Sequence, residues 1–343
     1  MRILVGMSGG VDSTYAAKKL LSQGHEVVGA VLVMHDYTDV KSAEEAARRV
    51  GIPLVTVDCR RAFSDIIEKY FIDEYVRGRT PNPCIVCNRE VKFRFLCDYA
   101  TANGFDRIGT GHYARVTERT EGGVTRYAVS RAADLSKDQT YMLYRLPEDV
   151  LSMLVLPMGD EIKSEVKARA ESLGITDGGQ KESQEICFIP DNNYASYIEK
   201  ARGKSREGNF VDTDGNILGR HKGVIHYTVG QRKGLGISLG ERAFVSRIDP
   251  ERNEITLSRE GSVTDTVEIS DCVYSGIAQL PVGASREVTV KVRYLAPLVK
   301  ATLTALEGNR AVIKLHAPVR SVAPGQSVVA YDGDTVLVGG FID

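Results

Sequence analysis

Long apolar runs, a strong excess of one charge and a disulfide framework are all missing from this chain of 343 residues. No stretch approaches the roughly 18 apolar residues that cross a bilayer, so we expect no membrane partner. Six cysteines over this length indicate functional thiols in a reducing compartment rather than disulfides that hold a small fold together. A strand pattern begins at residue 2, so we expect no signal peptide and a cytoplasmic location.

The charge balance is nearly even, with 44 Lys and Arg against 45 Asp and Glu, and taken alone it argues against binding to nucleic acid. The average hides two basic stretches. Residues 216–240 contain no acidic residue, and residues 286–320 carry seven basic residues against Glu287 and Glu307. Such stretches are either surfaces for phosphate contacts or ordinary solvated faces, and charge alone leaves both open.

A glycine-rich run near the N-terminus lies between a short apolar strand and a helical pattern, and it reads Gly6-Met7-Ser8-Gly9-Gly10-Val11-Asp12-Ser13-Thr14. It lacks the Gly-Lys-Ser/Thr of a Walker A loop and the G-x-G-x-x-G spacing of dinucleotide-binding folds. Adjacent glycines let backbone N–H groups approach an anion, and the following helix adds the positive end of its dipole. The run therefore predicts a phosphate-binding loop; a plain turn at a strand end is the alternative.

Strands alternate with helices over the first 204 residues, which predicts a doubly wound α/β domain around a parallel sheet. Ligands bind beyond the carboxyl ends of the strands in such sheets, so the glycine-rich run and the end of the second strand near Leu32 should share one edge. The expected strands are 2–5, 27–34, 54–57 and 107–110, and the expected helices are 12–23, 42–50, 61–76, 90–103, 137–146 and 161–173.

Two cysteines lie in the segment Pro81-Asn82-Pro83-Cys84-Ile85-Val86-Cys87-Asn88, whose two prolines argue against regular structure. We expect Asn88 to cap a helix over 90–103. Cys87 would then lie just before a helix N-terminus, which lowers a thiol pKa and favours the thiolate. A third cysteine, Cys187, stands in the apolar run Ile186-Cys187-Phe188-Ile189.

The sequence changes character after about residue 204, where short β-branched runs and turn dipeptides replace the helices. Asp214-Gly215-Asn216 and Asp332-Gly333 predict hairpin turns, and residues 114–130 predict another hairpin around Gly122-Gly123. We expect three domains: the α/β domain at 1–204, a small β-rich domain at 205–262, and a barrel of about six strands at 263–343.

Six motifs occur in one order along the chain: Ser-Gly-Gly-x-Asp-Ser, Arg-Thr-Pro-Asn-Pro-x-x-x-Cys-Asn, Gly-Thr-Gly-His-Tyr-Ala, Lys-Asp-Gln-Thr-Tyr, Ile-Cys-Phe-Ile and Gly-Gln-Arg-Lys-Gly-Leu-Gly. The first resembles the PP-loop of ATP pyrophosphatases, and the ordered set resembles the tRNA 2-thiouridylase family over essentially the whole length. The resemblance implies adenylation of the C2 oxygen of a wobble uridine in tRNA by ATP with Mg²⁺, followed by replacement of that oxygen with sulfur.

The resemblance also assigns residues to roles. It implies that Cys187 carries a persulfide and that Cys87 is the second catalytic thiol, which releases sulfide or forms a disulfide with Cys187. Asp12 is a plausible Mg²⁺ ligand. The implied ATP-binding residues are Gly6, Met7, Ser8, Gly9, Gly10, Val11, Asp12, Ser13, Leu32 and Gly111. The implied tRNA-binding residues are Asn82, Pro83, Cys84, His112, Lys137, Asp138, Gln139, Arg293, Tyr294 and Gln326, and the implied partners are tRNAs that read Lys, Glu and Gln codons and a sulfur donor such as a cysteine desulfurase or a sulfur carrier.

Cys84 departs from the resemblance, because many members of the family have Asp in this place. Cys84-x-x-Cys87 is a spacing used by metal ligands and redox pairs. With Cys187 it could hold a 4Fe-4S cluster whose open iron binds sulfide; a persulfide enzyme in which Cys84 only lines the base pocket is the alternative. Cys59, Cys97 and Cys272 match no motif, and we take them as structural.

Three other functions are compatible with the first motif. An amidotransferase-type ligase would adenylate a small molecule, although the β-rich half and the thiols have no role in that reaction. A different tRNA thiolase is the second alternative. A nucleotide-sensing RNA-binding module without catalysis is the third. Dependence of ATP–pyrophosphate exchange on tRNA, and the effect of replacing Cys187, separate these possibilities.

Overall fold

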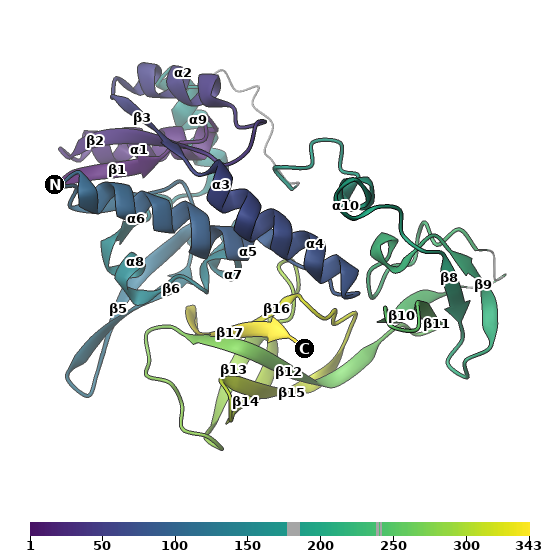
Figure 1. Ribbon diagram of the computed structural model, residues 1–343. Helices are drawn as coiled ribbons and strands as arrows, with labels where there is room; N and C mark the ends of the chain where they lie inside the picture. The colour runs from purple at the N-terminus through teal and green to yellow at the C-terminus, as the bar shows by residue number, and fades with distance from the viewer. Residues whose placement is uncertain (177–185, 238–239, 241) are drawn as a thin grey trace.

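The computed structural model describes residues 1–176, 186–237, 240 and 242–343 (Figure 1). These residues form a parallel sheet with helices on both faces, a four-stranded mixed sheet and a large antiparallel sheet. None of the helices in these ranges combines the length and apolarity that crossing a bilayer requires.

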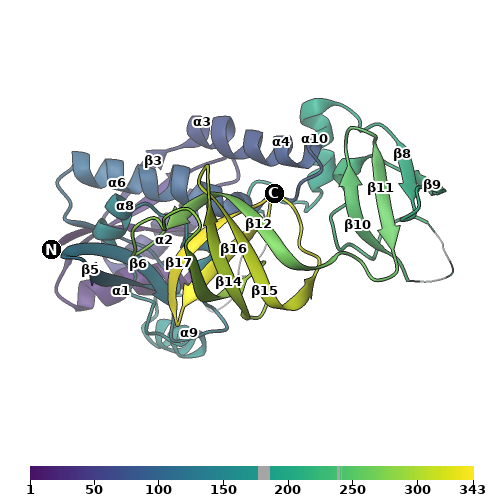
Figure 2. The same cartoon turned by 90° about the horizontal axis from the view of Figure 1, so that it is seen from below.

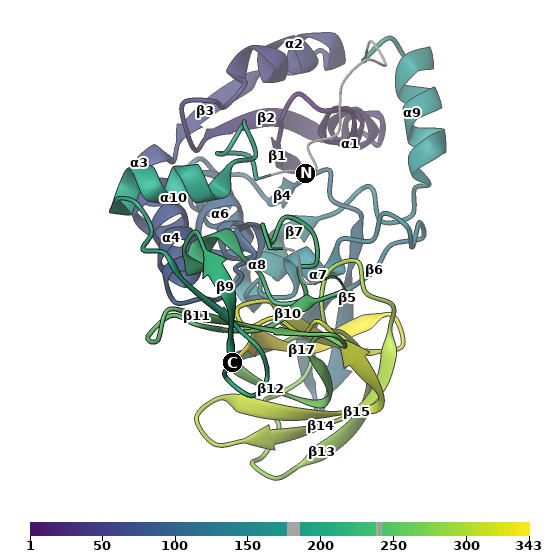
Figure 3. The ribbon, with the colours of Figure 1, turned by 90° about the vertical axis from the view of Figure 1, so that its right-hand side faces the viewer.

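The N-terminal sheet has the strand order β3-β2-β1-β4-β7, and its neighbouring strands are all parallel. Its central strand β1 is buried on both faces: Leu4 packs with α6, whereas Ile3 and Val5 pack with α1, α2 and α9. Figure 3 shows α1, α2 and α9 on one side of the sheet and α6 and α8 on the other. The strands are β1 (Arg2–Gly6), β2 (Glu26–Val33), β3 (Leu54–Asp58), β4 (Arg107–Gly109) and β7 (Leu154–Val155), and these helices are α1 (Val11–Ser22), α2 (Val40–Val50), α6 (Phe93–Ala102), α8 (Glu148–Met153) and α9 (Lys163–Ser172). The doubly wound sheet is confirmed.

Two long helices contain a π-helical turn. The first runs through α3 (Arg60–Phe63), a π turn at Ser64–Glu68 and α4 (Lys69–Val76). The second runs through α5 (Pro83–Cys87), a π turn at Asn88–Lys92 and α6.

The second helix corrects two expectations. The chain around Pro83 is helical, because Pro83 occupies the first turn, where a missing N–H costs nothing. Asn88 is inside the helix instead of capping it, and its side chain donates to the Met142 carbonyl at 2.9 Å.

The middle sheet has the order β10-β11-β8-β9 and closes over Phe210, Val245 and Ile255, all fully buried. The hairpin expected around residues 214–216 connects β8 and β9. The elements are α10 (Tyr194–Arg202), β8 (Gly208–Val211), β9 (Ile217–His221), a short 3₁₀ turn (Val224–His226), β10 (Phe244–Asp249) and β11 (Glu254–Ser258).

The C-terminal strands close into the expected six-stranded antiparallel barrel, because β12 pairs with both β15 and β17. The strands are β12 (Val263–Tyr274), β13 (Ser285–Lys291), β14 (Val299–Leu306), β15 (Arg310–Arg320), β16 (Ser327–Asp332) and β17 (Thr335–Ile342). The hairpin expected over 114–130 forms as β5 (Ala114–Glu121) and β6 (Val124–Arg131).

That hairpin also joins the two halves of the chain, which the sequence did not suggest. It extends the barrel sheet through the pair Ser130 and Thr335, and β5 and β6 lie beside β17 in Figure 2. The next helix, α7 (Thr140–Leu143), continues this contact: Tyr141 donates its hydroxyl hydrogen bond to the Ser327 carbonyl at 2.8 Å. The barrel is therefore fixed to the edge of the α/β domain where ligands are expected.

Candidate active site

The glycine-rich run forms a tight loop between β1 and α1. The Ser13 hydroxyl donates to the Gly10 carbonyl at 3.1 Å and accepts the Ser8 backbone N–H at 3.2 Å. Thr14 also donates to the Gly10 carbonyl, at 2.8 Å. These bonds hold the loop at the N-terminus of α1, where backbone N–H groups and the helix dipole favour an anion.

Two glycines in and beside the loop have no room for a side chain. Gly9 has a φ of +79°, and a Cβ there would lie 2.7 Å from the Ser42 backbone carbon. Gly111 follows β4, and a Cβ on it would lie 2.6 Å from the Ser13 amide nitrogen. Gly111 therefore lies directly against the start of α1. Leu32 is at the end of β2, two residues past Ala30, which pairs with Gly6. Met7 is buried.

We expect Gly111→Ala to weaken ATP binding at least tenfold, because the new methyl group forces the 110–112 loop away from the amides at the start of α1. Titration calorimetry with ATP and Mg²⁺ measures the change, and thermal unfolding measures any loss of stability. Gln23→Ala, at the exposed far end of α1, is the control. An unchanged ATP affinity in a folded Gly111→Ala protein would contradict this placement.

Asp12 makes an ion pair that the sequence did not reveal. Both of its carboxylate oxygens accept from the Lys163 ammonium, at 2.7 and 2.6 Å, and one also accepts from the Tyr113 hydroxyl at 3.0 Å. Lys163 begins α9, 151 residues away along the chain. A carboxylate and an ammonium thus lie side by side at the phosphate loop, where one suits Mg²⁺ and the other suits a phosphate oxygen.

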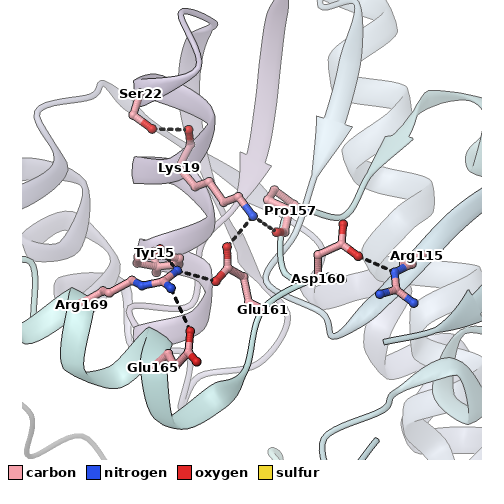
Figure 4. A network of polar contacts seen from close by, with 9 residues as sticks. All are labelled: Tyr15, Lys19, Ser22, Arg115, Pro157, Asp160, Glu161, Glu165 and Arg169. Atoms are coloured by element: carbon pink, nitrogen blue, oxygen red, sulfur yellow. Dashed lines mark hydrogen bonds and ion pairs between the residues drawn. The ribbon is translucent and has the colours of Figure 1, made fainter. Parts of the chain in front are cut away.

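A polar network keeps α9 against α1 (Figure 4). Glu161, which is buried, accepts from Lys19 of α1 at 2.6 Å and from Arg169 of α9 at 2.9 Å. Lys19 also donates to the Pro157 carbonyl at 2.8 Å. Because Glu161 is bonded to both helices, it fixes the start of α9 and therefore the position of Lys163 beside Asp12.

Cys87 of α5 lies at the same edge of the sheet. The Cys87 thiol lies 3.8 Å from the Met34 sulfur, directly after β2. Burial raises the pKa of Cys87 to about 12, and the charge of Lys92 opposes this increase. The expected low pKa of Cys87 is therefore wrong. Cys87 lies inside a continuous helix, at the end of α5, and not ahead of a helix N-terminus. Loss of water on burial therefore has the largest effect on the pKa of its thiol.

Cys187 is solvent-exposed, in contrast to Cys87. Partial desolvation raises the pKa of its thiol, and Lys92 again opposes the increase. Its neighbour Phe188 is buried between Phe63 and Phe71, with ring centroids 5.4 and 5.3 Å away. The aromatic contact anchors the segment and leaves the Cys187 thiol accessible. Residues 177–185, which precede this segment, lie outside the described residues.

The three thiols do not form a metal site. Within the described residues, which include all six cysteines, no group of three His, Cys, Asp or Glu side chains is arranged to hold a metal ion. Cys59 and Cys272 are buried and Cys97 packs against the core, in agreement with structural roles.

His112 lies beside the phosphate loop. It directly follows Gly111, packs against Phe93 at a ring-centroid distance of 5.6 Å, and shares a 2.9 Å hydrogen bond with Thr110. Burial and the charge of Lys92 lower the pKa of His112 to about 3. The imidazole is therefore neutral at physiological pH and suits hydrogen bonding to a base rather than pairing with phosphate.

Three of the residues expected to contact tRNA have partners inside the protein. Asp138 is buried; it accepts from the Thr140 hydroxyl at 2.8 Å and lies 3.7 Å from the Lys291 ammonium. Its carboxylate is therefore unable to reach tRNA directly. Gln139 accepts the Tyr113 N–H at 2.8 Å, and Gln326 donates to the Thr80 carbonyl at 2.9 Å. Gln326 thus holds the barrel against the loop that precedes α5.

The remaining expected residues differ in exposure. Pro83 is buried in the first turn of α5, and Asn82 lies beside Met142. Tyr294 packs against Tyr141 at 5.9 Å between ring centroids, and burial together with Asp138 and Cys84 raises its pKa. The barrel therefore contributes Tyr294 to the surroundings of Cys84. Arg293 is exposed, and Lys137 is partly buried.

The sheet, the phosphate loop and the family models identify the class of protein as that of the PP-loop proteins. Residues 1–191 match the model described as "tRNA methyl transferase HUP domain", and the loop at the start of α1 is that of ATP-using PP-loop proteins. Residues 195–259 match "tRNA methyl transferase PRC-barrel domain", and residues 265–342 match "Aminomethyltransferase beta-barrel domain".

Full-length relatives identify the family. Three proteins named tRNA-specific 2-thiouridylase MnmA are 42%, 41% and 43% identical to this chain, from Acetivibrio thermocellus, Caldicellulosiruptor saccharolyticus and Lachnoclostridium phytofermentans. The alignments cover 99%, 100% and 99% of this chain and 99%, 98% and 99% of the relatives. The chain belongs to the tRNA-specific 2-thiouridylase family, whose members are tRNA sulfurtransferases. Among solved structures, a 4-thiouridine synthetase–RNA complex with bound ATP matches 58% of this chain and 50% of that chain, at 18% identity and a TM-score of 0.38.

Proposed function

We propose that this protein uses ATP to activate the C2 oxygen of the wobble uridine in tRNA and replaces it with sulfur. One observation carries the proposal: the phosphate loop, a neutral histidine and two thiols, one exposed, share one edge of the sheet. His112 follows Gly111, which lies against the loop, and Lys92 acts electrostatically on His112, Cys87 and Cys187. Activation and sulfur delivery would thus take place in one site.

The first half-reaction is adenylation. The uridine C2 oxygen attacks the α-phosphorus of ATP, and pyrophosphate leaves with the electron pair of the broken P–O bond. The loop amides and Lys163 stabilise the negative charge on the phosphates. Asp12 is the carboxylate that would hold Mg²⁺, which neutralises phosphate charge when bound. His112, uncharged, would donate to or accept from the edge of the extruded base.

The second half-reaction is sulfur transfer. The terminal sulfur of a persulfide on Cys187 attacks C2, and AMP departs with the C2–O electron pair. The Cys87 thiolate then attacks the Cys187 sulfur, so the S–S bond breaks, its electron pair becomes the C2–S double bond, and the two cysteines form a disulfide. A small-molecule or protein thiol reduces that disulfide before the next turnover, and a cysteine desulfurase or sulfur carrier reloads Cys187.

We propose that the two β-rich domains, with bounds at residues 204 and 262, hold the tRNA. We propose that Arg293, Lys137 and the basic stretch at 216–240 contact the phosphates. Asp138 and Gln326 act indirectly, since their partners are Lys291 and Thr80. The acceptors would be tRNAs that read Lys, Glu and Gln codons.

The test is a reaction with purified protein, ATP, Mg²⁺, unmodified tRNA and a persulfide-generating cysteine desulfurase, followed by mass spectrometry of the nucleosides. We expect 2-thiouridine at the wobble position, dependent on ATP. 4-Thiouridine would indicate a different thiolase. Methylated uridine formed with a methyl donor would instead indicate a methyltransferase, the activity named in the descriptions of the family models. Pyrophosphate exchange that does not depend on tRNA would indicate a ligase for small molecules.

The cluster route is the second candidate, and it requires Cys84, Cys87 and Cys187 to converge on one iron-sulfur group. The Cys84-x-x-Cys87 spacing is the feature that favours this route. Anaerobic reconstitution with iron and sulfide tests it. We expect thiolation by protein that contains no iron; activity that requires stoichiometric iron would favour the cluster over the persulfide.

A further inference from the structure

The loop between α4 and α5 is fixed at its start by the way α4 ends. Gly78 follows the helix with a φ of +71°, in the left-handed region. Its N–H donates to the Tyr75 carbonyl at 3.0 Å, and the Arg79 N–H donates to the Glu74 carbonyl at 2.9 Å. These two bonds form a Schellman motif, which ends a helix and turns the chain. Arg79 therefore begins the loop toward α5 from a set position.

The Arg79 side chain joins this helix end to the barrel. Its Nε donates to the Glu74 carboxylate at 2.8 Å, and its Nη2 donates to the carbonyl of Ile342, the last residue of β17, at 3.0 Å. The Glu74 and Arg79 side chains are 10% and 28% exposed. Because the donors of a guanidinium form a rigid planar fork, one side chain holds a carboxylate of α4 and a carbonyl of the barrel at the same time.

The barrel also holds the next residue of the loop, by its backbone. The Thr80 N–H donates to the Pro324 carbonyl at 2.7 Å, and the Thr80 carbonyl accepts from Gln326 at 2.9 Å. Gly325 lies between these two partners with a φ of +85°, and a Cβ on it would lie 3.1 Å from the Thr80 nitrogen. Two successive residues of the loop are therefore bonded to the barrel.

This attachment lies close to the residues proposed to receive the target base. Cys84 is in the first turn of α5, four residues after Thr80, and Asn82 directly precedes that helix. We propose that Arg79 is a positioning residue of the thiolation reaction: its two hydrogen bonds set the place of Asn82 and Cys84 relative to tRNA held by the barrel. The proposal rests on the function proposed above. Arg79 acts through the loop, because its donors are bonded to Glu74 and Ile342.

Arg77 provides the matched control, because it contacts the same carboxylate. Its Nη1 donates to the other oxygen of Glu74 at 3.2 Å, and its side chain is 68% exposed. Arg77→Met and Arg79→Met each remove one cation from Glu74 and leave the other in place. Only Arg79→Met also removes the bond to Ile342. A difference between the two variants therefore reports the connection to the barrel and not the loss of a charge beside Glu74.

The first measurement is amide hydrogen exchange of the full-length protein without tRNA or ATP, followed by peptide mass spectrometry. Arg79→Met should speed exchange in residues 84–92 about tenfold, because the start of α5 is no longer held. Arg77→Met should match the wild type, and the peptide that contains β1 is the internal reference. Arg79→Lys is the milder variant, since its ammonium keeps a charge beside Glu74 without the fork to Ile342. It should show the same effect with a smaller loss of thermal stability.

The second measurement is the division of the effect between kcat and KM in wobble-uridine thiolation. Phosphate contacts dominate affinity for nucleic acid, so Arg79→Met should change the KM for tRNA by no more than about twofold. Its kcat should fall about tenfold to 100-fold, because the target base is no longer held at reacting distance. The stoichiometry of ATP binding in calorimetry counts the folded sites, so kcat is expressed per ATP-binding site.

Exchange rates and a kcat per site equal to those of Arg77→Met would overturn the role of Arg79. Faster exchange with a wild-type kcat per site would also overturn it, since Arg79 would then only stabilise the helix. Failure of the wild type itself to make 2-thiouridine would instead overturn the proposed function. The exchange result needs neither tRNA nor ATP and would still show whether Arg79 holds the loop.

Discussion

Replacement of Cys187 by serine is expected to abolish formation of 2-thiouridine while ATP and tRNA still bind and pyrophosphate is still released. A serine hydroxyl is unable to carry a sulfane sulfur, so the loss should reach the detection limit. The serine and threonine hydrogen bonds that hold the loop at residues 6–13 run within the loop and to the start of α1, so adenylation should continue. The accumulated intermediate is tRNA with AMP on the uridine, and mass spectrometry of the tRNA under mild conditions detects it.

Cys87→Ser is the comparison variant that distinguishes the roles of the two thiols. Cys187 should still accept one sulfur atom from the donor, visible as the added mass on its peptide, but release of product should fail. Cys97→Ser, which changes a cysteine that packs against the core outside the site, should retain activity. Full thiolation by Cys187→Ser would refute the assignment of the sulfur carrier, and persulfide found on Cys87 instead would reverse the two roles.

The parts of the site that could be predicted from the sequence are those encoded in short stretches. The loop at 6–14 was predictable because its strand, glycines, hydroxyls and helix are contiguous, and the doubly wound sheet followed from fully apolar strands. The six barrel strands and the turn at Asp332-Gly333 were predictable for the same reason. Each depends on residues within about ten positions of one another.

The residues that sequence reasoning missed depend on tertiary contacts. Lys163 meets Asp12 across 151 positions, and nothing near Lys163 distinguishes it from the exposed Lys167 one turn later. Asp138 stands in a motif, but only the fold reveals that its carboxylate is buried. The error at Cys87 was avoidable: Asn82-Pro83 is a cap followed by a first-turn proline, and that signal starts the helix before Cys84.

Lys163→Met is expected to lower the rate of tRNA-dependent pyrophosphate release about 100-fold or more, the usual effect of removing a group that stabilises transition-state charge. In the protein without nucleotide, Lys163 neutralises Asp12; the two side chains are 15% and 31% exposed. When ATP and Mg²⁺ bind, the carboxylate has a metal ion to face and the ammonium has a phosphate. The ion pair therefore keeps a carboxylate and an ammonium at the loop. Each group has a partner of opposite charge both without nucleotide and with ATP and Mg²⁺ bound.

A stability effect has to be separated from this catalytic one, because Lys163→Met leaves Asp12 partly buried without its cation. The double variant Asp12→Asn/Lys163→Met removes both charges. We expect it to unfold at a higher temperature than Lys163→Met alone, yet to remain as inactive in adenylation. Lys167→Met, on the exposed face of α9, should match the wild type in both measurements. If folded Lys163→Met, assayed well below its unfolding temperature, keeps the wild-type rate, Lys163 is only a structural partner of Asp12; if it is folded and slow, the ammonium acts on the phosphates.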